Sequence, residues 1–419
     1  MPQGTAMKAV AVAALLAFLA LPAFADPDEE RLGKLQGYPV GTASSWYQNP
    51  YRVGSWSALD RVPGVQVRRV ARSTETTPLP RVANPPTIRY WHRNTSYTLD
   101  QYLEHQRTNG LLILRNGEIV VERYGYGRKD DARFLSFSMA KSVTSLLIGR
   151  ALEAGMIGSL DAPAEKYVKA LAGSPYGGTK IRDLLRMSSG LTFSERYDGN
   201  DDIARLSRAL AGAQGAWAPM DVLKSITSRH SSPGGKFVYA SAESDVLGRV
   251  LVAATGRTMA DLTSEWLWQP MGAEHDAFWR VSVDGQEQAH GAYNASLRDW
   301  GRLGLLLAND GRVGDKQVLP REYLLDATDP ARQPPAFRPR TATPYFGYGY
   351  QFWIAPMKER TFAMQGIHGQ TVFVQPSSGI VLVLASVWEQ ASGRQDPAPY
   401  EERGNLWRGV LESLGGRTD

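Results

Sequence analysis

Short apolar runs bounded by turn residues gather toward both ends of the chain, and they predict β-strands there. Near residue 115, apolar segments 111–114 and 119–124 flank Arg115-Asn116-Gly117-Glu118, and Asn-Gly between such runs is a strong hairpin signal. Toward the C-terminus, further strands are predicted at 348–354, 371–375 and 380–387, with a turn at 376–379 between the last two.

The region between these runs has the apolar spacing of helices. A helix is predicted to begin near Ser138, with its buried stripe at Val143, Leu146, Leu147 and Ala151. Further helices are predicted at 181–187, 245–254, 297–309 and, at the end of the chain, 401–414.

Strands at both ends with helices between predict an α/β (α+β) fold with one antiparallel sheet. The sheet would come from about 96–135 and 345–415, and a mainly helical lobe from about 136–344. Residues 26–95 are rich in Pro, Gly, Arg and Trp, which predicts an irregular arm packed on the body. Its anchors would be aromatic: Trp46, Tyr47, Tyr51, Trp56, Tyr90 and Trp91.

The first 25 residues have the pattern of a secretory signal peptide. Lys8 precedes an apolar run at 9–21, and Ala23-Phe24-Ala25 precedes an acidic segment, so cleavage is predicted after Ala25. A membrane anchor is the competing interpretation, but the run is short for a bilayer span. We therefore expect an exported protein, periplasmic or secreted by a bacterium, with no stable membrane span.

Composition narrows the function classes. The 419 residues are 43% hydrophobic and 21% charged, which is typical of a globular protein, and they include no cysteine, which excludes a cysteine nucleophile. The net charge of +5 comes from scattered lysines and arginines, so no nucleic-acid footprint is visible. Six dispersed histidines form no ligand motif, and no metal or cofactor is implied. Oligomeric state is open.

The strongest chemical signal is the spacing of Ser138 and Lys141 at a predicted helix start. Residues three apart share a helix face, so an uncharged lysine could take the serine proton and create a nucleophile. Such a pair also occurs by chance at ordinary helix starts, so the catalytic interpretation needs support from other motifs.

Two other segments could complete a site. Tyr239 and Ser241 precede a predicted helix, and a phenol near a neutral lysine can pass a proton to a leaving group. Gly366 and Gly369 flank His368 ahead of a strand, where the backbone could donate N–H groups to an oxyanion. The alternatives are a tyrosine packed by its ring and a plain glycine turn.

Taken in order, these segments resemble the serine β-lactamase and penicillin-binding protein superfamily. The resemblance covers about residues 95–415 and is to the class C-like branch, including 6-aminohexanoate-dimer hydrolases and related carboxylesterases. It is carried by Phe137-Ser138-Met139-Ala140-Lys141-Ser142, Gly158 to Pro163, Leu184 to Leu191, Pro233 to Gly248, Leu267 to Gly272, Ser296 to Gly304 and Gly366 to Gln370. The fold it implies is β-lactamase/transpeptidase-like.

The resemblance also implies roles. Ser138 would be the acylated nucleophile, Lys141 its base and Tyr239 the proton-transferring tyrosine, with the backbone N–H groups of Ser138 and Ile367 as the oxyanion hole. Which residue of 364–370 lines that hole is left open by the spacing alone. Substrate contacts would fall to Tyr197, Ser241, Gly366 and His368.

Two departures from the family pattern bear on function. Ser241 stands where asparagine is usual, and Met364-Gln365-Gly366 or His368-Gly369-Gln370 stands where Lys-Thr-Gly or His-Thr-Gly is usual. We therefore expect a small-molecule ester or amide substrate, as in a carboxylesterase or 6-aminohexanoate-oligomer hydrolase. A DD-peptidase or β-lactamase is the alternative enzyme, and a non-catalytic envelope-ligand binding protein is the alternative of another class.

Overall fold

The computed structural model describes residues 26–419, and its centre is a seven-stranded antiparallel sheet. The sheet has the order β11-β12-β13-β14-β15-β4-β5, so strands from the two ends of the chain pair directly where β15 meets β4. Its strands are β4 (Thr108–Arg115), β5 (Glu118–Tyr124), β11 (Gly347–Tyr348), β12 (Trp353–Ile354), β13 (Phe362–Gln365), β14 (Thr371–Gln375) and β15 (Ile380–Ser386). The predicted fold class is confirmed.

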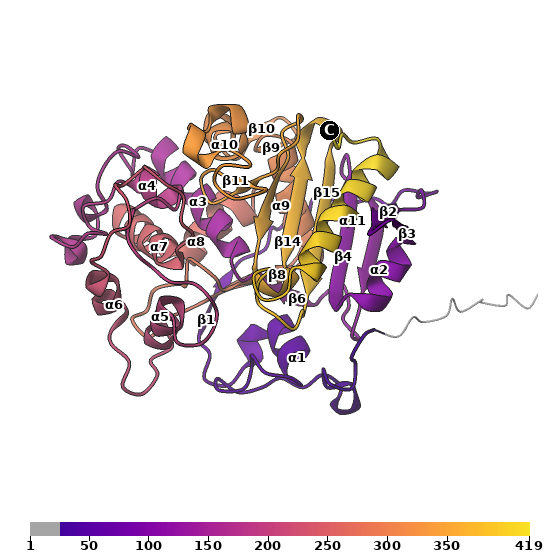
Figure 1. Ribbon diagram of the computed structural model, residues 1–419, viewed down its shortest axis with the longest axis horizontal. Helices are drawn as coiled ribbons and strands as arrows, with labels where there is room; N and C mark the ends of the chain where they lie inside the picture. The colour runs from indigo at the N-terminus through magenta and orange to yellow at the C-terminus, as the bar shows by residue number, and fades with distance from the viewer. Residues whose placement is uncertain (1–25) are drawn as a thin grey trace, which may run out of the picture.

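Side-chain alternation on β4 explains why the sheet is covered on both faces. Leu111 and Ile113 belong to an apolar cluster with α11 (Ala398–Leu414) and α2 (Leu99–His105), whereas Leu112 and Leu114 belong to a cluster with α9 (Leu297–Ala308). Successive strand residues point to opposite faces, so one strand contributes to both clusters. Figure 1 shows α11 lying across one face of the sheet, with α9 on the other.

Helices gather beside the sheet, around α3 (Met139–Glu153). The other helices are α4 (Ile181–Leu185), α5 (Asp202–Leu210), α6 (Pro219–Ser225), α7 (Ser241–Thr255), α8 (Met259–Thr263) and α10 (Arg321–Thr328). Helix α3 is buried from Met139 through Gly149, not along a single stripe as the spacing predicted. A helix buried on all sides is a core element, and here it fixes the residues at its N-terminus.

The arm differs from the irregular segment that composition predicted. It contains α1 (Arg52–Ser57), β1 (Val67–Val70) and β2 (Arg89–His92), and β2 pairs with β3 (Thr95–Thr98). Strand β1 completes a second sheet with the order β1-β7-β8-β6, formed with β6 (Arg133–Leu135), β7 (Ala277–Arg280) and β8 (Tyr293–Ser296). A small ribbon pairs β9 (Arg312–Val313) with β10 (Lys316–Gln317).

The predicted strand at 348–354 was wrong, because it is two short strands, β11 and β12, that pair with each other. The chain reverses at Gln351, whose φ is 63°, and this buried side chain is held by bonds to the backbone of Leu184 and Leu185. Strand β13 was not predicted.

The predicted signal peptide, residues 1–25, lies outside the described residues. Within residues 26–419 every helix is too short or too polar to cross a bilayer.

Candidate active site

Ser138 sits at the N-cap position of α3, three residues after the end of β6. The approach to it is fixed by Ser136, whose N–H donates to the Tyr293 carbonyl at 2.7 Å and whose hydroxyl accepts from the Tyr293 N–H at 3.1 Å. Phe137 then takes a left-handed conformation, with φ of 43°. Such a conformation is unusual for a bulky residue and is found where the surrounding structure holds it in place.

Lys141 lies one helical turn after Ser138. Its Nζ donates to Ser138 Oγ at 3.0 Å and to the His290 carbonyl at 2.6 Å. The side chain is almost wholly buried, and this desolvation lowers the pKa of Lys141 to about 8, against an opposing pull from Glu195. At this pKa roughly a tenth of the amine is uncharged at pH 7, far more than for an ordinary lysine, and the uncharged form can act as a general base.

Tyr239 joins this pair from the segment just before α7. The Lys141 Nζ lies 5.0 Å from the centre of its ring, and the Trp353 ring stacks on it at 5.6 Å between centroids and 22° between planes. Burial, chiefly, and the nearby Glu195 raise the pKa of Tyr239 well above its usual value, while a hydrogen bond with Ser138 lowers it. The phenol therefore keeps its proton and can donate it.

Gly366 brings the end of β13 against the residues before Ser138. A Cβ at Gly366 would lie 2.3 Å from the Ser136 carbonyl oxygen and 3.1 Å from Phe137 Cβ, so this close approach requires glycine. Within residues 26–419, the N–H groups of Ser138 and Ile367 donate to no protein acceptor. Two free N–H groups on adjoining segments are what an oxyanion hole needs.

Glu195 links two further predicted residues. Its carboxylate accepts from the Ser241 N–H at 2.8 Å, from the Ser241 hydroxyl at 2.7 Å and from the Tyr197 hydroxyl at 2.7 Å. The Tyr197 backbone is left-handed, with φ of 60°. Glu195 thus holds both Ser241 and Tyr197 by hydrogen bonds, and Ser241 is buried.

His368 is placed differently from the predicted substrate contact. Its side chain is 2% exposed, with Nδ1 2.8 Å from the Trp388 carbonyl oxygen and Nε2 bonded to the Tyr47 hydroxyl. Both ring nitrogens are engaged within the protein, so the ring has no free atom for a substrate. Of the residues before it, Gly366 lies against Ser136 and Phe137, and Ile367 packs on the apolar cluster that contains Phe137.

The fold agrees with comparisons to known proteins. The chain matches the Beta-lactamase family over residues 97–403. The protein belongs to the beta-lactamase family. A 6-aminohexanoate-dimer hydrolase of Paenarthrobacter ureafaciens is 27% identical to it over 370 residues, which are 86% of this chain and 91% of that protein. A teichoic acid D-alanine hydrolase of Staphylococcus aureus is 26% identical over 68% of this chain and 72% of that protein.

Solved structures show the same beta-lactamase-family fold. One from Bacillus anthracis, assigned to the 6-aminohexanoate-dimer hydrolases, superposes with a TM-score of 0.79 at 23% identity, over 90% of this chain and 99% of that one. A family VIII carboxylesterase superposes with a TM-score of 0.53 at 15% identity, over 73% of this chain and 92% of that one.

Sequence reasoning missed three parts of this candidate site: Glu195, the His290 carbonyl and Trp353. Glu195 stands two residues before Tyr197 but 46 before Ser241, so its role depends on a long-range contact that local spacing does not encode. A backbone carbonyl has no sequence signature at all. Trp353 was visible only as part of an apolar run.

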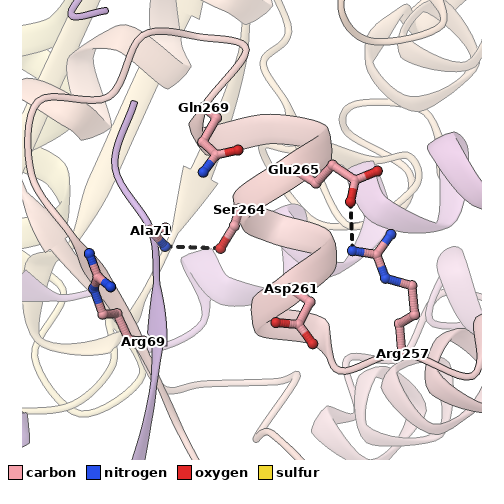
Figure 2. Close-up of a pocket in the computed structure, with 7 residues that line it drawn as sticks. All are labelled: Arg69, Ala71, Arg257, Asp261, Ser264, Glu265 and Gln269. Atoms are coloured by element: carbon pink, nitrogen blue, oxygen red, sulfur yellow. Dashed lines mark hydrogen bonds and ion pairs between the residues drawn. The ribbon is translucent and has the colours of Figure 1, made fainter. Parts of the chain in front are cut away.

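A surface hollow beside α8 shares no lining residue with this site (Figure 2). Its Arg257 is paired with Glu265 at 2.6 Å, and its Ser264 hydroxyl accepts from the Ala71 N–H at 2.9 Å. Arg69, also at its rim, is paired with Asp276. The arginines are already neutralised, so the hollow has the character of a packing seam between the arm and the body.

Proposed function

We propose that this protein is a serine hydrolase that cleaves ester or small amide bonds through an acyl-enzyme. The observation that carries the proposal is the 3.0 Å hydrogen bond between Lys141 Nζ and Ser138 Oγ, made by a desolvated amine. A lysine in this state can act as a base without a histidine. Its relatives named as hydrolases of a 6-aminohexanoate dimer and of teichoic acid D-alanine support the same reaction class.

Acylation would begin when Lys141 takes the Ser138 proton and the alkoxide attacks the substrate carbonyl. The oxyanion would lie between the N–H groups of Ser138 and Ile367, at the N-terminus of α3, whose dipole favours negative charge. Tyr239 would give its proton to the leaving alcohol or amine and recover one from Lys141. The C–O or C–N bond then breaks, and the acyl group stays on Ser138.

Deacylation would repeat these steps with water. Lys141 and Tyr239 take a proton from the water as it attacks the acyl carbonyl, and the proton returns to Ser138 Oγ as its bond to the acyl group breaks. The products are an acid and the regenerated enzyme. The nucleophile and the proton-transfer groups proposed for this cycle are Ser138, Lys141 and Tyr239.

Esters and small amides are favoured over β-lactams and D-alanyl peptides because the third motif is Met364-Gln365-Gly366, with no lysine. A cation does contact this part of the sheet: Arg403 donates to Gln365 at 2.7 Å and to Thr371 at 2.5 Å. Its side chain is 2% exposed and already bonded, so it is poorly suited to hold a substrate carboxylate.

The deciding experiment is intact-mass detection of an adduct on Ser138, with a panel of p-nitrophenyl esters, short amides and penicillins. We expect acylation by esters and no turnover of the esters by Ser138→Ala, which should stay folded. Lys141→Ala and Tyr239→Phe should each lose most of the activity, at least about 10²-fold, since they remove a proton-transfer group. Turnover retained by Ser138→Ala would refute the proposal.

We also propose that the mature protein begins at Asp26 and works outside the cytoplasm. The support is the leader-like pattern of residues 1–25 and the absence of cysteine from the sequence. N-terminal sequencing of the protein recovered from the periplasm or medium tests this. An uncleaved N-terminus on a cytoplasmic protein would contradict it.

A further inference from the structure

The N-terminal arm contacts the residues next to both predicted oxyanion donors. Phe137 precedes Ser138, and His368 follows Ile367. Both are left-handed, with φ of 43° and 59°, although neither is glycine. Such conformations persist only where surrounding contacts hold them, and here the arm supplies many of those contacts.

Aromatic rings of the arm touch both residues. The Trp56 ring lies 4.8 Å from the Phe137 ring and 4.9 Å from the His368 ring, measured between centroids. The Tyr47 ring lies 6.1 Å from Phe137 and 5.2 Å from His368. Trp56, Phe137 and His368 are buried and Tyr47 is partly buried, so the four rings form one packed cluster beside the site.

One hydrogen bond in this cluster has a defined direction. The Trp388 carbonyl can only accept, so His368 Nδ1, 2.8 Å away, must carry the proton. Burial, chiefly, and the nearby Arg52 cation lower the pKa of His368 to about 3, so the ring is neutral. His368 Nε2 is therefore an acceptor, and the Tyr47 hydroxyl donates to it.

The arm also contacts the Trp388 carbonyl, which is the other hydrogen-bond partner of the His368 ring. Arg52 Nη1 donates to the same Trp388 carbonyl at 2.7 Å. That carbonyl is thus bonded to His368 from one side and to the arm from the other. The His368 N–H itself donates to the Ala391 carbonyl at 3.0 Å, which ties this loop to the chain after β15.

We propose that Tyr47 is a positioning residue for catalysis: through its hydrogen bond to His368 it orients the Ile367 N–H toward the oxyanion. This inference rests on the proposed acyl-enzyme function. It gives the arm a role in the reaction, although the arm, residues 26–95, precedes the segment at 97–403 that matches the family. Tyr47 touches neither substrate nor reacting atoms in this scheme, and it acts through His368 and the backbone of Ile367.

Tyr47→Phe tests the proposal, because it removes the hydroxyl and keeps the ring. Loss of an oxyanion donor costs about 10²–10³ in kcat, so a misaligned one should lower kcat by roughly tenfold. KM should be unchanged, since the ground-state carbonyl depends little on this donor. The affinity of an alkyl boronic acid, whose tetrahedral adduct on Ser138 places an oxygen in the hole, should fall by a similar factor.

Tyr38→Phe is the matched control. It is the same change in the same arm, but its hydroxyl donates to Glu29 at 3.1 Å and not to His368. We expect kcat, KM and boronic acid affinity at the wild-type values. Wild-type values in Tyr47→Phe, or equal losses in both variants, would overturn the proposal.

A second variant removes the acceptor of the same Tyr47–His368 hydrogen bond. His368→Asn suits a left-handed backbone and can still donate to the Trp388 carbonyl, but it lacks the second ring nitrogen. If Tyr47 acts through His368, the double variant that combines Tyr47→Phe with His368→Asn should lose no more activity than the more impaired single variant. Losses of activity that add up in the double variant would contradict the mechanism. A wild-type protein that neither turns over esters nor forms an adduct would refute the proposed function instead.

Discussion

At the scale of single residues, Glu195 is the group whose charge acts on the proposed base. Its carboxylate opposes the desolvation that lowers the pKa of Lys141 to about 8. Because the base works only when deprotonated, kcat/KM should rise with pH through an apparent pKa near that value. The same carboxylate also secures Ser241 and Tyr197, so it combines an electrostatic and a positioning role.

Glu195→Gln should therefore shift the acid limb of the pH profile to lower pH. The amide oxygen can still accept from Ser241, but the negative charge that favours the ammonium form of Lys141 is gone. The measurement is kcat/KM against pH with a p-nitrophenyl ester. Asp198→Asn, an equal change of charge on an exposed side chain of the same loop, should leave the limb in place. An acid limb unmoved in Glu195→Gln would exclude this electrostatic role.

At the scale of elements, the approach of β13 to the start of α3 defines the proposed oxyanion hole. Gly366 has an ordinary φ of −124°, so its requirement for glycine comes from contact and not from backbone strain. Gly366→Ala would press a methyl group against the Ser136 carbonyl. Since a shift of about 1 Å can cost 10²-fold, we expect kcat to fall by about that factor.

Gly404→Ala is the control for that variant, because a Cβ at Gly404 in α11 meets no atom within 4 Å. It should keep full activity and gain about 0.5–1 kcal/mol of stability from helix propensity. Thermal unfolding of both variants shows whether Gly366→Ala is folded at the assay temperature. A folded Gly366→Ala with wild-type kcat would argue against an oxyanion hole at this junction.

Elements with a strong local pattern were predictable. Asn116-Gly117 gave the β4–β5 hairpin, and predicted helix 297–309 differs from α9 by one residue. Strand β1 could not be predicted, because it pairs Val67 with Arg280, far along the chain. For the site, motif spacing suggested Ser138, Lys141 and Tyr239, which the structure brings together. Glu195 depends on contacts that only the folded chain creates.

At the scale of the whole molecule, the arm and the body share apolar clusters and sheets. Tyr90 is buried and bonded to Glu402 of α11 at 2.6 Å, whereas Trp91, predicted as an anchor, is 65% exposed. The arm also contributes five apolar side chains, each at most 2% exposed, to the cluster that contains Phe137 and Val387. They are Leu32, Val53, Trp56, Leu59 and Val62. The boundary of the family match at residue 97 is therefore not a boundary of the folded unit.

A chain that begins at residue 97 should consequently fail to fold cooperatively. Burying each large apolar side chain contributes about 1.5–3 kcal/mol to the free energy of unfolding. Removing the five buried side chains of the arm therefore costs an amount comparable to the whole stability of a typical protein, about 5–15 kcal/mol. A chain that begins at Asp26 keeps every described residue and should unfold cooperatively and hydrolyse esters. Far-UV circular dichroism melts and ester turnover compare the two. If the shorter chain unfolds cooperatively and keeps full activity, the arm is dispensable. The body would then be stable without β1 and active without the aromatic cluster around Tyr47.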